Sequence, residues 1–214
     1  MKKEEIFVRV DHTLLNPCAR WDDIQELCEE AIRCQTASVC IPPSYIKRVR
    51  DNYPNLCICT VIGFPLGYST LETKKAEIEE AITNGADELD VVINLGDVKN
   101  GEFNKITKEL TALKQTTGKR ILKVIVETCY LTATEKEKLC QCVTESGADF
   151  IKTSTGFGTG GATLEDIELF KKCIGSNVKI KASGGVRTRE DFEAFLAAGC
   201  DRIGASSAVK VLDD

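Results

Sequence analysis

The stretch TESGADFIKT, from Thr144 to Thr153, contains an expected helix end, a tight turn and a strand start. Gly147 falls where the helix should stop, because the residue after a helix often adopts a left-handed conformation that glycine takes at least cost. The apolar run that follows predicts a buried strand. Related stretches close two other helix-like segments, ITNGAD at residues 82–87 and AAGCD at residues 197–201. This weak internal repeat predicts a chain built from recurring helix-to-strand junctions.

Strand-like apolar runs alternate with helix-like segments along the whole chain. The expected strands are Val8–Asp11, Ala37–Ile41, Cys57–Phe64, Glu88–Ile93, Ile121–Glu127, Phe150–Thr153, Val178–Ala182 and Arg202–Gly204. The expected helices are Asp22–Arg33, Ser44–Asn52, Thr70–Thr83, Phe103–Thr116, Thr134–Glu145, Leu164–Cys173, Arg189–Ala198 and a short tail from Ser206. Such alternation with buried strands indicates a parallel sheet. We therefore predict an α/β fold, a (β/α)8 TIM barrel forming a single domain over residues 1–214, with an open doubly wound sheet as the alternative.

Composition narrows the possible partners. The chain has 214 residues, of which 43% are hydrophobic and 29% charged, and a formal net charge of −5. This balance is ordinary for a globular protein, and it offers no broad basic surface to nucleic acid or to an acidic membrane. No apolar run approaches the roughly 18 residues that predict a membrane span, and the charged start MKKEE leads into no secretory signal. We expect a cytoplasmic protein with neither nucleic acid nor membrane as a partner.

The chain has eleven cysteines and one histidine. The closest cysteine pairs, Cys57/Cys59 and Cys140/Cys142, are spaced C-x-C, and no C-x-x-C occurs, so we do not predict a metal site. Most of the cysteines are interpreted as small apolar fillers that stay reduced. Cys40 is the first candidate for a reactive thiol near a site.

Four consecutive expected strands each carry a charged side chain: Asp90, Lys123, Lys152 and Lys181. Barrel interiors are normally filled by branched apolar side chains, and an unpaired buried charge is costly. Because neighbouring strands lie about 4.8 Å apart, the last two lysines can meet, and Asp90 can reach them across a narrow barrel. Two roles stay open for Lys123: it takes part in the site, or it only neutralises Asp90 or Glu127.

Burial of a lysine penalises its charged form, and a neutral amine attacks carbonyl groups to form a Schiff base. Two neighbouring ammonium groups also disfavour each other's charge, so Lys152 or Lys181 can be the nucleophile. We favour Lys152, because its strand runs directly into the loop TSTG at residues 153–156. Asp90 is then placed to move protons. The alternative is a buried ion-pair network that serves stability alone.

Glycine-rich loops follow the last three expected strands: TGFGTGG at residues 155–161, SGGVR at 183–187 and GASS at 204–207. Their backbone N–H groups and hydroxyls suit a phosphate, and loops after strands seven and eight form a recurring phosphate site in (β/α)8 barrels. Plain tight turns are the alternative. An amine beside an anion site indicates chemistry on a phosphorylated carbonyl compound.

Two earlier segments are less specific. DHTLL at residues 11–15 ends the first expected strand, so Asp11 and Thr13 could face the barrel interior, whereas His12 is interpreted as a structural hydrogen-bonding residue. GFPLG at residues 63–67 ends the third expected strand and is expected to form one wall of a pocket.

Taken together, these segments resemble the deoxyribose-phosphate aldolase family, whose members are class I aldolases. The resemblance covers essentially the whole chain. It rests on Asp11 to Leu15, Gly63 to Gly67, Ala86 to Val92, Leu122 to Thr128, Phe150 to Gly156, Ser183 to Thr188 and Gly204 to Ser207.

The resemblance implies reversible cleavage of 2-deoxy-D-ribose 5-phosphate to D-glyceraldehyde 3-phosphate and acetaldehyde, without a metal or organic cofactor. It implies Lys152 as the Schiff-base lysine, Lys181 as the residue that favours its neutral form and moves protons, and Asp90 as the acid–base partner. The implied substrate- and phosphate-binding residues are Gly156, Gly184, Gly185, Gly204, Ser206, Ser207, Thr155 and Asp11. It also implies a small sugar phosphate as the partner, and a homodimer. Two other functions stay open: a catalytically inactive sugar-phosphate-binding barrel, and another phosphate-binding barrel that is an isomerase or synthase.

Overall fold

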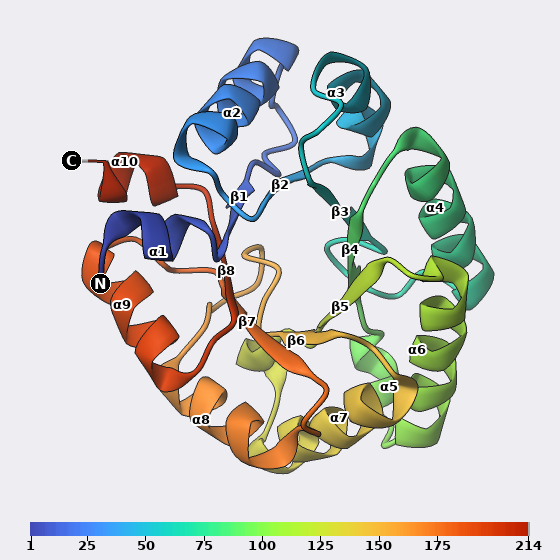
Figure 1. Cartoon of the computed structure of the whole chain (residues 1–214). Coiled ribbons are helices and arrows are strands. Elements are labelled where there is room, and N and C mark those ends of the chain that lie inside the picture. Colours follow the sequence, from blue (N-terminus) through green and yellow to red (C-terminus); the bar gives the residue numbers. More distant parts are fainter. Residues whose placement is uncertain (214) are drawn as a thin grey trace.

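The computed structural model describes residues 1–213 and places eight parallel strands in one closed barrel, in the order β1 to β8. Helices surround the barrel on the outside (Figure 1). The strands are β1 Val10–Thr13, β2 Ser38–Ile41, β3 Ile58–Ile62, β4 Glu88–Val92, β5 Ile121–Ile125, β6 Phe150–Lys152, β7 Lys179–Ser183 and β8 Arg202–Ala205. Pairing of β1 with β8 closes the sheet, so the predicted (β/α)8 barrel is confirmed and the open doubly wound sheet is wrong.

The helices follow the predicted alternation, and two short helices that were not predicted lie before β1 and after β4. They are α1 Lys3–Phe7, α2 Trp21–Cys34, α3 Ile46–Asn52, α4 Leu71–Asn84, α5 Leu95–Lys99, α6 Phe103–Thr117, α7 Ala133–Ser146, α8 Leu164–Cys173, α9 Arg189–Ala198 and α10 Ala208–Leu212, with 3₁₀ turns at Pro43–Tyr45 and Thr128–Tyr130. In the part of the chain that the structure describes, none of them is long and apolar enough to span a membrane.

The repeated junction at the ends of α4, α7 and α9 has a physical explanation. Gly85, Gly147 and Gly199 all adopt the left-handed conformation, with φ of 108°, 77° and 114°. The aspartate that follows each glycine accepts a hydrogen bond from the backbone N–H of a neighbouring strand. The pairs are Ile58 to Asp87 at 2.9 Å, Leu122 to Asp149 at 2.8 Å and Ile180 to Asp201 at 2.9 Å. The motif thus ends a helix and ties the next strand into the barrel.

Most boundaries differ from the predicted ones by one or two residues, and two of these differences have clear reasons. The first strand was expected from Val8, but α1 occupies Lys3–Phe7 and buries Ile6 and Phe7, which delays β1 until Val10. The third strand was expected to reach Phe64, but Gly63 is left-handed with φ of 60° and ends the extended conformation after Ile62. The expected domain also included residue 214, which lies outside the described residues.

Candidate active site inside the barrel

Asp90 lies at the centre of a charged cluster inside the barrel. Because alternate residues of a strand point to the same side, β4 directs Asp90 inward, and the side chain is completely buried. Its Oδ2 accepts from the ammonium groups of Lys152 at 2.8 Å and Lys181 at 2.7 Å, and its Oδ1 accepts from Lys123 at 2.9 Å. Lys152 and Lys181 are partners in the register of β6 and β7. The three lysines that the sequence singled out therefore converge on one carboxylate.

Three further charged side chains complete the cluster. Asp11, on β1, accepts from Lys181 and from Ser38, the latter at 2.8 Å. Arg202, at the start of β8, lies 2.5 Å from Asp11 and 3.2 Å from Glu88. Glu88 also lies 2.5 Å from the ammonium of Lys123.

Sequence reasoning missed two members of this cluster, Glu88 and Arg202. A signal was available for Glu88, because it stands two residues before Asp90 on the same strand and must share its inward side. Arg202 stands two residues before Gly204 in the same way, but only closure of the barrel between β8 and β1 brings it against Asp11.

The charge states of the cluster follow from its contacts. Burial alone favours the neutral amine of Lys181, but the carboxylates of Asp11 and Asp90 outweigh burial and raise its pKa above the ordinary lysine value. Burial likewise opposes the charge of Asp90, yet the three lysine side chains around it, with Lys123 the strongest, hold its pKa well below the ordinary value. Lys181 and Asp90 are therefore held in their charged forms.

Lys123 is charged for the same reason. Burial favours its neutral amine, but the nearby carboxylates, with Asp90 the strongest, raise its pKa well above the ordinary value. Of the two carboxylate partners that the sequence left open for Lys123, the structure pairs it with Asp90. Glu127 is not its partner, because the ion pairs of Lys123 join it to Asp90, Glu88 and Asp11.

The loop after β6 packs against the loop after β7. Gly156, Gly184 and Gly185 are left-handed, with φ of 85°, 79° and 81°. A Cβ on Gly161 would overlap the backbone carbonyl of Gly184, so only glycine allows this close approach. Within residues 1–213, the backbone N–H groups of Gly156, Gly184 and Gly185 donate to no protein acceptor. Unpartnered amides in adjacent glycine-rich loops form a suitable anion site.

Gly204 and the two serines of the β8 loop have different roles. A Cβ on Gly204 would lie 3.1 Å from Cε of Lys181, so this glycine leaves room for the lysine stem beneath the loop. Ser206 is exposed at the end of β8. Ser207 donates to the carbonyl of Val186 at 3.3 Å and so joins the β8 loop to the β7 loop.

Both hydrogen-bond donors of Thr155 contact one neighbouring carboxylate. Its hydroxyl donates to Glu127, and its backbone N–H lies 3.2 Å from the same carboxylate. The resemblance implied a direct role for Thr155 in positioning substrate and water, but the structure directs both of its donors to Glu127, a residue that the sequence reasoning considered only as a partner of Lys123.

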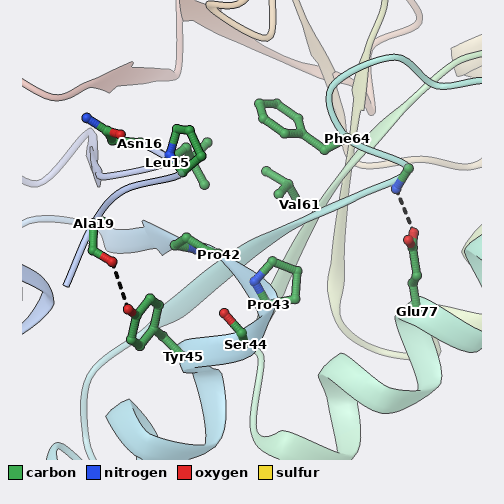
Figure 2. Close-up of a pocket in the computed structure, with 12 residues that line it drawn as sticks. Leu15, Asn16, Ala19, Pro42, Pro43, Ser44, Tyr45, Val61, Phe64 and Glu77 are labelled. Atoms are coloured by element: carbon green, nitrogen blue, oxygen red, sulfur yellow. Dashed lines mark hydrogen bonds between the residues drawn. The ribbon is translucent and has the colours of Figure 1, made fainter. Parts of the chain in front are cut away.

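A cavity of about 300 Å³ is lined by residues at and beyond the ends of β1, β2 and β3 (Figure 2). Figure 2 shows Leu15, Val61 and Phe64 facing the opening. Val61 packs with Cys40 and Cys59, and the Cys59 thiol lies 3.1 Å from Asp90. Gly63 and Phe64 both line this cavity, and a contribution of residues 63–67 to the wall of the substrate pocket stays a prediction.

The cysteines and the histidine behave largely as expected. All eleven cysteines are free, and burial raises the pKa of Cys28, Cys140 and Cys200 to about 12, which suits inert fillers. Cys40 differs, because a hydrogen bond with Cys59 lowers its pKa although burial opposes the shift. His12 is buried, and its Nε2 lies 2.7 Å from Glu30, which confirms the structural interpretation.

Comparison with known proteins shows the family. The family model described as DeoC/LacD family aldolase matches residues 6–209. A deoxyribose-phosphate aldolase of Clostridium botulinum (strain Alaska E43 / Type E3) is 60% identical over 99% of this chain and 96% of that protein. One of Clostridioides difficile (strain 630) is 55% identical over 98% and 96%.

Solved structures agree with this family. The aldolase QR15 superposes with a TM-score of 0.94 at 37% identity, covering 98% of this chain and 95% of that one. The deoxyribose-phosphate aldolase of Aeropyrum pernix, described as tetrameric, superposes with a TM-score of 0.89 at 32% identity, covering 99% and 91%. With these matches over nearly its whole length, the chain belongs to the DeoC/LacD aldolase family.

Proposed function

We propose that this aldolase reversibly cleaves 2-deoxy-D-ribose 5-phosphate to D-glyceraldehyde 3-phosphate and acetaldehyde through a Schiff base on Lys152. The observation that carries the proposal is the pair of buried lysines, Lys152 and Lys181, that share one oxygen of Asp90. The names of the relatives support the substrate. The isomerase and synthase alternatives would not need this lysine pair.

A count of charges supports Lys152 as the nucleophile. The ion-paired cluster holds four basic groups (Lys123, Lys152, Lys181 and Arg202) against three carboxylates (Asp11, Glu88 and Asp90). Charge balances if one basic group is neutral. Lys152 has one carboxylate partner, whereas each of the other three has at least two, so Lys152 is the basic group that is least held by ion pairs. A neutral amine is what attack on an aldehyde requires.

The reaction then proceeds within the cluster. Nζ of Lys152 attacks the aldehyde carbon of the open-chain sugar, and the carbinolamine loses water to give an iminium ion. Deprotonation of the C3 hydroxyl breaks the C2–C3 bond, D-glyceraldehyde 3-phosphate leaves, and the electron pair moves to the nitrogen as an enamine. Protonation at C2 followed by hydrolysis releases acetaldehyde and the free amine. Asp90 accepts hydrogen bonds from both lysines, so it stabilises the cationic iminium and links Lys181 to the reacting nitrogen for proton transfer.

The phosphate is assigned to the loops after β6, β7 and β8. Gly156, Gly184 and Gly185 offer unpartnered N–H groups, and Ser206 and Ser207 follow β8, where Ser207 bonds to the β7 loop at Val186. Such loops with a following short helix are the usual phosphate position of this fold. The sugar then extends from these loops toward Lys152, which ends β6.

Borohydride trapping tests the proposal most directly. The protein is incubated with 2-deoxyribose 5-phosphate, reduced with sodium borohydride and digested for peptide mapping by mass spectrometry. We expect a reduced adduct on Lys152. Absence of any adduct from the folded protein would remove the Schiff-base mechanism and favour the inactive binding barrel. An adduct on Lys181 would keep the reaction but overturn the assignment of the two lysines.

Gly161→Ala is expected to lower kcat/KM for the phosphorylated sugar by about 10²-fold, because displacing the β6 loop misplaces the substrate. A Cβ at Gly161 would overlap the Gly184 carbonyl, so the two loops must move apart. Gly160→Ala is the matched control, since its Cβ would meet only Cβ of Cys129, at 3.1 Å. Steady-state kinetics of the two variants check this. Equal effects of both substitutions would show that the contact between the loops is unimportant.

The cytoplasmic location and the homodimer expected from the sequence stay predictions. The tetrameric relative from Aeropyrum pernix makes the oligomeric state a useful measurement. Sedimentation equilibrium of the purified protein distinguishes two subunits from four.

A further inference from the structure

Glu127 is a buried carboxylate that the proposed mechanism does not use. It follows the end of β5, and its side chain is almost fully buried. Its polar contacts are to Thr155 and, at 4.0 Å, to the thiol of Cys129. Among the residues that the structure describes, no lysine or arginine forms an ion pair with it. A buried carboxylate without a cation depends on hydrogen-bond donors for its stability. The hydrogen bonds from Thr155 therefore hold Thr155 and Glu127 firmly in their relative positions.

The backbone at Glu127 adds an independent observation. Its φ of 56° makes it one of only two left-handed residues other than glycine among residues 1–213. Such a conformation persists where the surrounding structure enforces it. Here the flanking residues continue the pairing with β6 beyond the end of β5. Val126 N–H donates to the carbonyl of Lys152 at 3.0 Å, and Thr128 N–H donates to that of Thr153 at 2.9 Å. The chain is thus fixed on both sides of Glu127, and its carboxylate faces the β6 loop.

Hydrogen bonds connect Glu127 to successive residues of the β6 loop. Thr155 donates its hydroxyl and its N–H to the carboxylate, and its hydroxyl oxygen in turn accepts from the N–H of Phe157 at 3.0 Å. Gly156 lies between these two residues, and its own N–H has no protein acceptor within the described chain. Holding Thr155 and Phe157 therefore fixes the direction in which the Gly156 amide points.

We propose that Glu127 is a positioning residue for binding of the substrate phosphate. Glu127 acts through Thr155, which holds the Gly156 amide in the orientation that binds the phosphate. This inference rests on the proposed function, because it takes the loop amides as the phosphate site. It assigns Thr155 a role as the link between Glu127 and the loop.

The test compares two substrates, 2-deoxyribose 5-phosphate and unphosphorylated 2-deoxyribose. We expect Glu127→Ala to raise KM for the phosphorylated sugar at least about tenfold, while kcat/KM for 2-deoxyribose stays within about twofold of wild type. Glu127→Gln keeps one acceptor oxygen and should give an intermediate KM. Thr155→Val should resemble Glu127→Ala, whereas Thr155→Ser keeps the hydroxyl and should resemble wild type.

The double variant Glu127→Ala/Thr155→Val makes the test specific. If the two residues act as one unit, their effects on KM for the phosphorylated sugar will not add. If Glu127→Ala lowered kcat/KM equally for both substrates, the role of Glu127 would be merely structural and the proposal would be overturned. Additive effects of the two substitutions on KM for the phosphorylated sugar would overturn it as well. A wild-type protein that cleaves neither substrate would instead refute the proposed function. The conservative Gln and Ser variants keep the test valid if the Ala or Val variant fails to fold.

Discussion

Lys152→Met is expected to lower aldolase activity by roughly 10⁴-fold or more while leaving the free energy of unfolding at or above the wild-type value. Activity falls because the nucleophile is lost. Stability is kept because the charged cluster then holds three cations against three carboxylates, and the methionine fills most of the space of a side chain that is only 4% exposed. Progress curves for cleavage and urea unfolding at pH 7 measure the two effects.

Lys181→Met is the matched control, because Lys181 is the register partner of Lys152 on the next strand. It removes the cation held between Asp11 and Asp90. Removing one partner of a buried ion pair costs about 3–5 kcal/mol of stability, so this variant should lose activity and stability together. If instead Lys152→Met destabilised the protein as much as Lys181→Met, the count of ion-pair partners that singles out Lys152 as the nucleophile would be wrong.

The repeating elements of this fold could be predicted from sequence because their causes are local. Gly147 ends α7 as expected, and Lys152 and Lys181 share one side of the sheet because they are register partners on neighbouring strands. Their meeting with each other could be predicted as well, since neighbouring strands lie about 4.8 Å apart, and Asp90 was expected to reach them across the narrow barrel.

The positions of the remaining site residues depend on closure of the barrel and on local backbone conformation, which the sequence pattern does not reveal. Asp11 and Arg202 are 191 positions apart, and only the pairing of β1 with β8 brings them together. Glu127 was hidden for another reason. Its left-handed conformation is unusual for a residue other than glycine, so no local pattern signals that its carboxylate turns toward Thr155.

Asp90→Asn is expected to lower the free energy of unfolding by about 3–5 kcal/mol at pH 7 and to lower kcat by about 10²- to 10⁴-fold. The substitution removes the carboxylate that the side chains of three lysines contact. The pKa of Asp90 is lowered in the folded protein, so its stabilising effect is present above the ordinary aspartate value of 3.8 and is lost as pH falls through the folded value. The difference in stability between wild type and variant should therefore narrow progressively below about pH 4. Urea unfolding between pH 2.5 and pH 7 measures it.

Asp90→Asn/Lys123→Met separates the two roles of Asp90. Lys123 contacts Asp90, Glu88 and Asp11 but neither the proposed Schiff-base nitrogen nor the glycine-rich loops. Removing it restores the charge balance that Asp90→Asn disturbs, so stability should recover by at least half. Activity should stay low, because proton transfer beside Lys152 still lacks its carboxylate. Recovery of activity together with stability would mean that Asp90 serves only to neutralise the lysines, and that the proton-transfer group must be sought elsewhere, first at Lys181 with Asp11.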